Sequence, residues 1–131
     1  MTRRQARELA LQTLFSIEIG KHDPARALED AEMRPGADTQ RAFLGELVLG
    51  TLDYGAEADA LIAPLLQGWT LERLPTVDRL VLRMALYELN RRRDTPRAVV
   101  INEAIELAKK YSTEESGGFV NGVLSNASKV A

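Results

Sequence analysis

The amino-acid sequence predicts an all-helical protein, and three observations support this. Good helix formers such as Ala, Leu, Glu and Arg are abundant, and no segment shows the strict alternation of a β-strand. Apolar residues recur instead at spacings of three and four over long stretches. Proline, glycine and aspartate interrupt these stretches where helices should begin or end. We therefore expect an all-α fold of six to seven helices, arranged as two packed helical subdomains.

The first half of the chain is expected to contain three helices. The first spans about Arg3 to Gly20, because glycine commonly ends a helix and the apolar residues of this span fall on one stripe. Asp23-Pro24 combines an N-cap with proline at the first helical position and opens a short helix to about Met33. Asp38 is expected to cap a long third helix that breaks near Pro64. The predicted core residues of the first and third helices are Ala6, Leu9, Ala10, Leu11, Leu14, Phe15, Ile17, Phe43, Leu44, Leu47, Val48 and Leu52.

The second half is expected to be organised around one helix. Gly68-Trp69-Thr70 predicts a turn, and residues 71–74 form at most a short helix. The following helix, from Pro75 to about Asn90, is apolar around nearly its whole circumference. Such a pattern is typical of a buried helix, so we expect this one to lie at the centre of the second half.

Two further helices are expected near the C-terminus. Thr95-Pro96 opens one that continues to about Tyr111. Residues 112–118 are expected to form a loop with at most a turn of helix, and the last helix to run from about Phe119 to the C-terminus. Gly122 is expected to allow a close helix–helix approach. The polar residues expected at that contact, in one buried network, are Asn121, Asn102 and Glu103.

The domain organisation follows from length and composition. A chain of 131 residues is typical of one domain, and its composition changes near Gly68. Halves of about 1–67 and 68–131 would each bury only a marginal core alone. We therefore expect the halves to pack together as a single domain.

Composition also argues against several classes of function. The chain has no cysteine, which excludes a disulfide scaffold, a thiolate zinc site and a cysteine nucleophile, and fits a cytoplasmic location. No segment resembles a signal peptide or a membrane span. The only histidine, His22, lies in a polar turn, and neither a phosphate-binding loop nor a metal-ligand spacing is present. We therefore expect no catalytic residue, no metal and no cofactor.

Charge is unevenly distributed although the net charge is only −2. Residues 1–21 carry four basic and two acidic side chains, whereas residues 22–66 carry three basic and nine acidic ones. Arg3, Arg4 and Arg7 lie in the first two turns of the first helix, where the helix dipole disfavours cations. From the charge pattern alone, an anionic partner and a merely solubilising N-terminus remain equal alternatives. For Arg91-Arg92-Arg93, at a helix C-terminus, capping is the favoured interpretation.

Four segments carry a resemblance to a known family. Arg3-Arg4-Gln5-Ala6-Arg7 opens the chain, and Val77-Asp78-Arg79 precedes Leu82-Arg83 and Tyr87-Glu88-Leu89. The other two segments are Ile101-Asn102-Glu103-Ala104, with Glu106-Leu107-Ala108, and Phe119-Val120-Asn121-Gly122-Val123-Leu124. With these residues the chain resembles the NusB family of bacterial transcription antitermination factors over essentially its whole length.

The resemblance implies a function and a set of partners. Proteins of this kind bind the boxA element of ribosomal RNA leader transcripts together with NusE, a small ribosomal subunit protein, and act on the transcription elongation complex with RNA polymerase. They have two helical subdomains and no catalytic activity. By position, the resemblance implies RNA-binding roles for Arg3, Arg4, Arg7, Tyr111, Glu115 and Phe119. It implies partner-binding roles for Phe15 and Asp78, and we expect Asp78 to lie at the exposed end of its helix.

Two departures from the family pattern weaken the expected RNA surface. Gln5 replaces a common arginine, and Gly117-Gly118 replaces bulkier, often basic residues. From the residues alone, packing is the favoured role for both Tyr111 and Phe119. Two alternative functions are the accessory domain of an RNA cytosine methyltransferase and a helical protein-interaction module without RNA affinity. The sequence leaves open whether the protein is a monomer or a homodimer.

Overall fold

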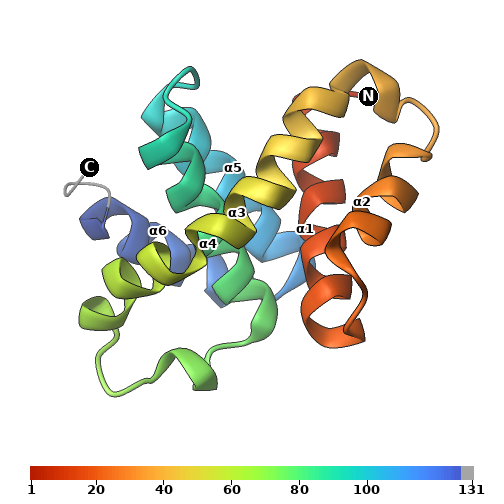
Figure 1. Cartoon of the computed structure of the whole chain (residues 1–131). Coiled ribbons are helices and arrows are strands. Elements are labelled where there is room, and N and C mark those ends of the chain that lie inside the picture. The colour runs from red at the N-terminus through yellow and green to blue at the C-terminus, as the bar shows by residue number, and fades with distance from the viewer. Residues whose placement is uncertain (128–131) are drawn as a thin grey trace. The chain divides into compact units, whose positions relative to one another are not determined.

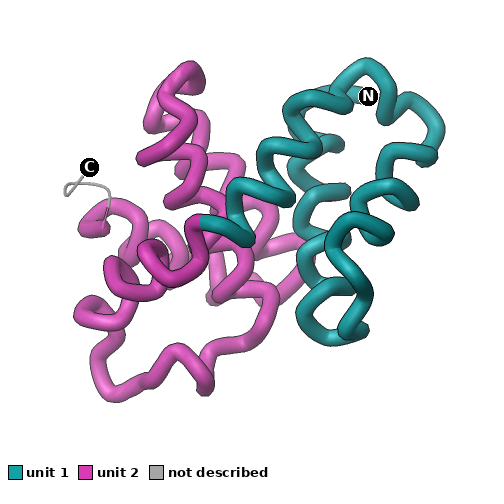
Figure 2. The backbone as a smooth tube through the Cα atoms, viewed as in Figure 1, with its two compact units in different colours: residues 1–53 teal, residues 54–131 magenta. Residues whose placement is uncertain are grey.

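The computed structural model describes residues 1–127 and confirms the all-helical prediction. Within that range the chain forms six α-helices and three short 3-10 helices, and no strand (Figure 1). None of the helices formed by residues 1–127 is long and apolar enough to cross a bilayer. The chain divides into two compact units, residues 1–53 and 54–131, as Figure 2 shows. The division falls inside the third helix, whereas the sequence placed the change of composition near Gly68.

The first unit begins with helix α1 (Arg3–Gly20), whose start is fixed by a reciprocal cap. The Gln5 backbone N–H donates to Thr2 Oγ1 (3.1 Å), and the Thr2 N–H donates to Gln5 Oε1 (2.9 Å). This pairing satisfies two backbone donors that a helix end leaves open. The helix ends at Gly20 as expected, but Lys21 is the residue that adopts the left-handed conformation (φ 57°).

Helix α2 (Pro24–Glu32) also starts as predicted, because Asp23 accepts a hydrogen bond from the Arg26 backbone N–H. It packs against α1 (Figure 1). The expected cap at Asp38 is wrong. Asp38 lies inside a 3-10 helix (Ala37–Gln40), and α3 (Arg41–Ile62) follows it directly. Gly36, with φ 82°, supplies the sharp entry to this short helix.

The apolar stripes predicted for the first unit are largely buried. All the predicted core residues of α1 are buried except Ile17, which is half-buried, and Phe15, which is 39% exposed. In α3 the stripe is buried from Phe43 to Val48, whereas Leu52 is exposed. The exposed apolar side chains mark surface that this fold leaves uncovered.

The second unit contains the rest of α3 and the three C-terminal helices, α4 (Thr76–Arg91), α5 (Arg97–Tyr111) and α6 (Glu114–Ala127). Pro64 ends α3 as predicted and lies in a 3-10 helix (Ala63–Leu65), and a second 3-10 helix (Leu71–Arg73) precedes α4. Helix α4 packs against both α5 and α6. Its buried apolar residues confirm it as the central helix of this unit: Leu80, Val81, Leu82, Met84, Ala85 and Leu86.

A bidentate ion pair joins α3 to α4 within the second unit. Arg83 donates through Nε to Asp59 Oδ1 (2.8 Å) and through Nη2 to Asp59 Oδ2 (2.7 Å). Because both hydrogen bonds are charge-assisted and parallel, they fix the geometry as well as contributing energy.

The start of the last helix differs from the prediction. Helix α6 begins at Glu114 and not near Phe119, because Thr113 caps it: the Ser116 backbone N–H donates to Thr113 Oγ1 (3.1 Å). Gly117 and Gly118 are therefore helical residues and not a loop. A Cβ on Gly117 would lie 2.9 Å from two side-chain carbons of Lys109, so Gly117 permits the close packing of α6 on α5. The expected course of α6 to the C-terminus extends over residues 128–131, which lie outside the described residues.

The expected buried polar contact at Gly122 is also wrong. Nothing lies within 4 Å of a Cβ built on Gly122, so it mediates no close helix contact. Asn121 and Asn102 are exposed and Glu103 is half-buried, so they do not form one buried network. Asn121 instead accepts a hydrogen bond from Ser125 Oγ (3.2 Å) on its own helix.

Candidate nucleic-acid interface

The N-terminal arginines gather around one aromatic ring in the first unit. The guanidinium carbon of Arg3 lies 4.0 Å from the centre of the Phe43 ring, and that of Arg7 lies 5.1 Å from it. Positions 3 and 7 share one helix face, as the sequence predicted, and α3 presents Phe43 to that face. Cation–π attraction therefore holds two positive charges near the start of α1 in spite of the helix dipole.

The three arginines are not equally accessible. Arg3 and Arg4 are exposed, but Arg7 is only 4% exposed. A buried guanidinium cannot reach a phosphate without rearrangement, so the phosphate contact expected of Arg7 conflicts with its position. Arg3 and Arg4 remain the accessible cations at this end of the chain.

Gln5 has a structural role in place of the arginine that the family pattern would suggest. Its side chain closes the capping box with Thr2. The residue therefore contributes to the N-terminal surface by fixing the start of the helix that bears Arg3 and Arg4.

The candidate RNA-binding residues of the second unit lie around the turn from α5 to α6. Tyr111 is the last residue of α5 and is half-buried, with Lys110 Nζ 5.4 Å from its ring centre. Glu115 is exposed in the first turn of α6, and Phe119 is half-buried in the second. Phe119 therefore does not start its helix, but it lines a hollow on the surface of this unit.

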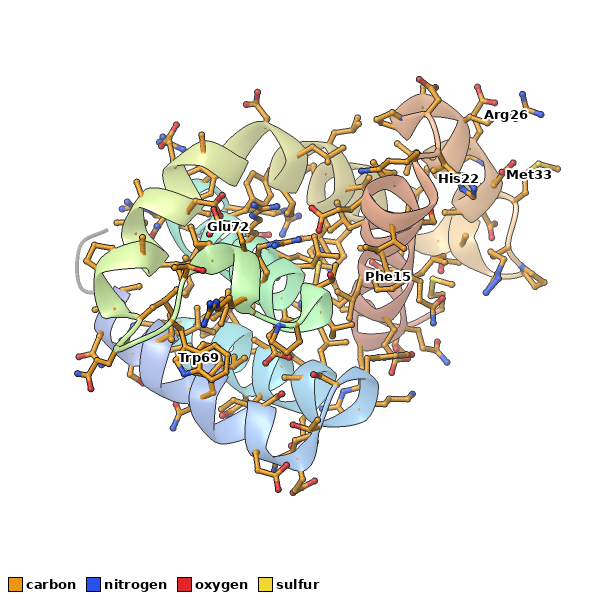
Figure 3. The ribbon with its side chains drawn as sticks, turned by 90° about the horizontal axis from the view of Figure 1, so that it is seen from below. Phe15, His22, Arg26, Met33, Trp69 and Glu72 are labelled. Carbon is orange, nitrogen blue, oxygen red and sulfur yellow. The ribbon has the colours of Figure 1, made fainter. Side chains whose placement is uncertain are left out.

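The two candidate partner-binding residues differ in exposure. Phe15 is 39% exposed on α1 (Figure 3). Asp78, expected at an exposed helix end, is only 4% exposed. The correction has a physical cause: Ser116 of α6 donates to Asp78 Oδ2 (2.9 Å), and Ser116 Oγ also lies 3.0 Å from Thr113 Oγ1 and 3.1 Å from Ser112 Oγ. The carboxylate thus joins the start of α4 to the first turn of α6.

Most of the other clustered basic residues form ion pairs. Arg91 pairs with Glu57 and lies over the ring of Tyr54, and Arg92 pairs with Asp94 (2.7 Å). Lys109 lies 3.9 Å from Glu114. These ion pairs are structural contacts, and they do not test the capping role favoured from the sequence.

Each unit thus assembles its own part of the predicted surface. Arg3 and Arg7 meet at Phe43 in the first unit, and Tyr111, Glu115 and Phe119 follow one another along the α5–α6 turn in the second. Among the described residues no group of three or more histidine or acidic side chains could hold a metal ion.

Sequence reasoning missed Ser116 and Trp69. The signal for Ser116 was present, because Thr113-Glu114-Glu115 is a typical helix start, with a capping threonine followed by acidic residues. Trp69 was read only as part of a turn. It is 57% exposed, and it lines the same hollow as Phe119.

Comparisons with known proteins place the chain in a family. A profile of the NusB family matches residues 4–129. The transcription antitermination protein NusB of Geobacillus kaustophilus is 47% identical over 95% of this chain and 94% of its own length. That of Desulforamulus reducens is 46% identical over 95% of this chain and 87% of its own.

Solved structures agree with the sequence comparisons. NusB of T. maritima superposes with a TM-score of 0.90 at 38% identity and covers 98% of this chain and 92% of that one. A chain in the crystal structure of antitermination factors NusB and NusE in complex with dsRNA matches with a TM-score of 0.84 at 27% identity, over 100% of both chains.

The fold and these matches define a class, the all-helical transcription antitermination factors, which are not enzymes. Within that class, the chain belongs to the NusB family. The resemblance seen in the sequence is thereby confirmed.

Proposed function

We propose that the protein is an RNA-binding antitermination factor that, with a NusE-like small ribosomal subunit protein, binds boxA-type RNA in ribosomal RNA leader transcripts. The observation that carries this proposal is the full-length match to a chain crystallised with NusE and RNA. The exposed Arg3 and Arg4 supply a second, independent support, because exposed cations gathered at one helix end favour an anionic partner.

In this proposal the two units contribute different kinds of contact. Arg3 and Arg4 bind phosphates, and Arg7, buried beside the same Phe43 ring as Arg3, holds that arrangement in place. Tyr111 and Phe119 stack on unpaired bases, as aromatic side chains do in single-stranded RNA recognition. The exposed carboxylate of Glu115 accepts hydrogen bonds from base amino groups.

The partner protein is proposed to contact the exposed Phe15 directly. Asp78 contributes from its buried position, by holding the start of α6 through Ser116. The assembled complex then acts on the elongating RNA polymerase. A homodimer that covers Arg3 and Arg4 would compete with RNA, and its formation is measured by the mass of the protein in solution.

Filter binding tests the proposal. A boxA RNA and a scrambled RNA of equal length and composition are titrated with the protein, alone and with its NusE-like partner. We expect tighter binding of boxA than of the scrambled RNA, with a larger difference when the partner is present. Equal retention of both RNAs under both conditions would reject sequence-specific RNA binding, and retention of neither RNA would favour the interaction module without RNA affinity.

A further inference from the structure

A surface hollow of about 580 Å³ lies within the second unit, between residues 64–69 and helix α6. Its lining includes two aromatic side chains from different elements, Trp69 and Phe119. Figure 3 shows Trp69 on the segment that precedes α4, beside the C-terminal helices. The hollow is open to solvent, and its volume exceeds that of a planar ring.

Trp69 is not explained by packing. Its side chain is 57% exposed, although burial of a tryptophan contributes more than that of almost any other residue. Exposed large aromatic side chains at a concave surface are typical of binding sites. The position of Phe119 on the same hollow gives a ligand two aromatic surfaces to contact.

The part of the hollow formed by α6 is unusually bare. Gly118 and Gly122 both line it, and nothing lies within 4 Å of a Cβ built on either residue. They are four positions apart and therefore lie on one face of the helix. Two glycines in a helix interior cost about 1 kcal/mol each relative to alanine, and here their effect is to keep the helix surface open beside Phe119.

Polar groups on the hollow match the edges of a nucleobase. Gln67 and Asn126 both line it, and asparagine and glutamine pair well with base edges. Asn126 donates through Nδ2 to the Gly122 carbonyl (2.8 Å), which orients its side-chain amide and leaves Oδ1 as an acceptor. None of the described lining residues is charged, which favours an uncharged planar ring over a phosphate or a charged peptide.

A cation contacts the residue next to one of the lining residues. Arg97 donates through Nη2 to the backbone carbonyl of Ser125 (3.4 Å), the residue next to Asn126. A guanidinium carries five donors, so it can also serve the phosphate of a nucleotide whose base enters the hollow.

We propose that this hollow holds one unpaired base of the bound RNA, stacked on Trp69, with Phe119 forming the α6 side of the same site. The inference rests on the proposed RNA-binding function and adds to it a stacking residue and a location for the base. It also explains why Gly118 and Gly122 are tolerated within α6: a side chain at either position would occupy the space of the base.

Trp69 is the only tryptophan of the chain, so its fluorescence reports on this hollow alone. The full-length protein is titrated with single-stranded boxA RNA while tryptophan emission is recorded, and filter binding is measured in parallel. We expect emission to be quenched with the same midpoint as filter binding. RNA retention without any change in emission would overturn the hollow as a base site and leave the proposed function standing, whereas no retention either with or without the NusE-like partner would overturn both.

Variants then test the contact itself. Trp69→Leu and Phe119→Ala should each weaken RNA binding about 5- to 150-fold, the equivalent of roughly 1–3 kcal/mol for one stacked base. Trp69→Phe, which keeps a ring, should lose less. If one base contacts both residues, the double variant should lose less than the product of the two single losses.

The control is Met33→Ala, which removes an 82% exposed side chain from the first unit and should leave binding unchanged. Wild-type affinity for Trp69→Leu would refute the proposal, as would quenching by the partner protein alone with no further change on RNA addition. Quenching by scrambled RNA as strongly as by boxA RNA would support the base site and reject only the sequence preference.

Discussion

Asp78 is a buried carboxylate whose two oxygens have different surroundings. Oδ2 accepts a hydrogen bond from Ser116, whereas Oδ1 is buried and makes no hydrogen bond to a described protein group. The residue lies in the first turn of α4, where the helix dipole favours a negative charge. One side chain thus couples the central helix to the first turn of α6, and a charge that the sequence assigned to a partner surface is part of the interior.

The Asp78–Ser116 contact gives the first prediction. Asp78→Ala should destabilise the protein by about 1–3 kcal/mol, because it removes the buried carboxylate that accepts the Ser116 hydrogen bond. Asp78→Lys should cost more, roughly 3–5 kcal/mol, because it buries an unpaired charge of opposite sign. Urea unfolding measures both losses. Glu72→Lys, the same type of change at an exposed acid (Figure 3), is the matched control and should be near neutral.

Helices α4, α5 and α6 determine the second unit at the scale of elements. Helix α4 is covered by both of the others, and the close approach of α6 to α5 depends on the absence of a side chain at Gly117. The open face of α6, with Gly118 and Gly122, borders the hollow instead. Glycines within the same helix therefore have two different physical roles, one in packing and one at the surface.

Truncation of the central helix tests its burial. Leu82 and Leu86 are both 0% exposed, so Leu82→Ala and Leu86→Ala should each destabilise the protein by ~2–5 kcal/mol through lost apolar burial and a residual cavity. Leu52→Ala, at a 41% exposed position, should cost much less. Losses below about half a kcal/mol at both buried positions would show that α4 is not the core of this unit.

The glycines of α6 give an opposing pair of predictions. Gly122→Ala should raise stability by about 0.5–1 kcal/mol through helix propensity, because its added methyl group meets open space. Gly117→Ala should stabilise less or destabilise, because its Cβ would lie 2.9 Å from Lys109 and 3.3 Å from Ile105. Thermal unfolding ranks the two variants. If Gly117→Ala is the more stable variant, Gly117 is not required for the close approach of α5 and α6.

At the scale of the whole molecule, the net charge of −2 opposes RNA binding, whereas the local clusters of positive charge favour it. The acidic residues 22–66 repel RNA, and Arg3 and Arg4 offer only a small attractive surface. Affinity of this chain alone should therefore be modest. A second RNA-binding protein in the complex would add contacts and raise the effective concentration of the RNA.

The salt dependence of RNA binding measures how many arginines contact phosphate. Two contacts to a single strand imply a slope of log affinity against log salt of about −1.4, from roughly −0.7 per contact, whereas three would give about −2. The double variant Arg3→Ala/Arg4→Ala should remove most of the slope. Arg26→Ala, an exposed arginine of α2 shown in Figure 3, is the control and should keep it. A wild-type slope in the double variant would exclude the start of α1 as the RNA surface.

The sequence by itself determined the helical fold class, most helix boundaries and the central place of α4 in its unit. These follow from local signals, such as the proline at position 24 and the all-round apolar pattern of residues 77–89, which depend on neighbours along the chain. The family assignment was also contained in the sequence, because four separate segments carried it.

Only the tertiary structure decided which polar residues are accessible. The sequence predicted that Arg7 and Asp78 are surface charges. Both are buried, because Phe43 contacts Arg7 and Ser116 contacts Asp78 from other elements. Gly117 and Gly122 are the same residue type in one helix, and only the position of α5 distinguishes their roles. The sequence showed Trp69 only as part of a turn, and the fold places its segment beside α6. Burial and proximity depend on residues distant in sequence, and a single chain read alone contains no local signal for them.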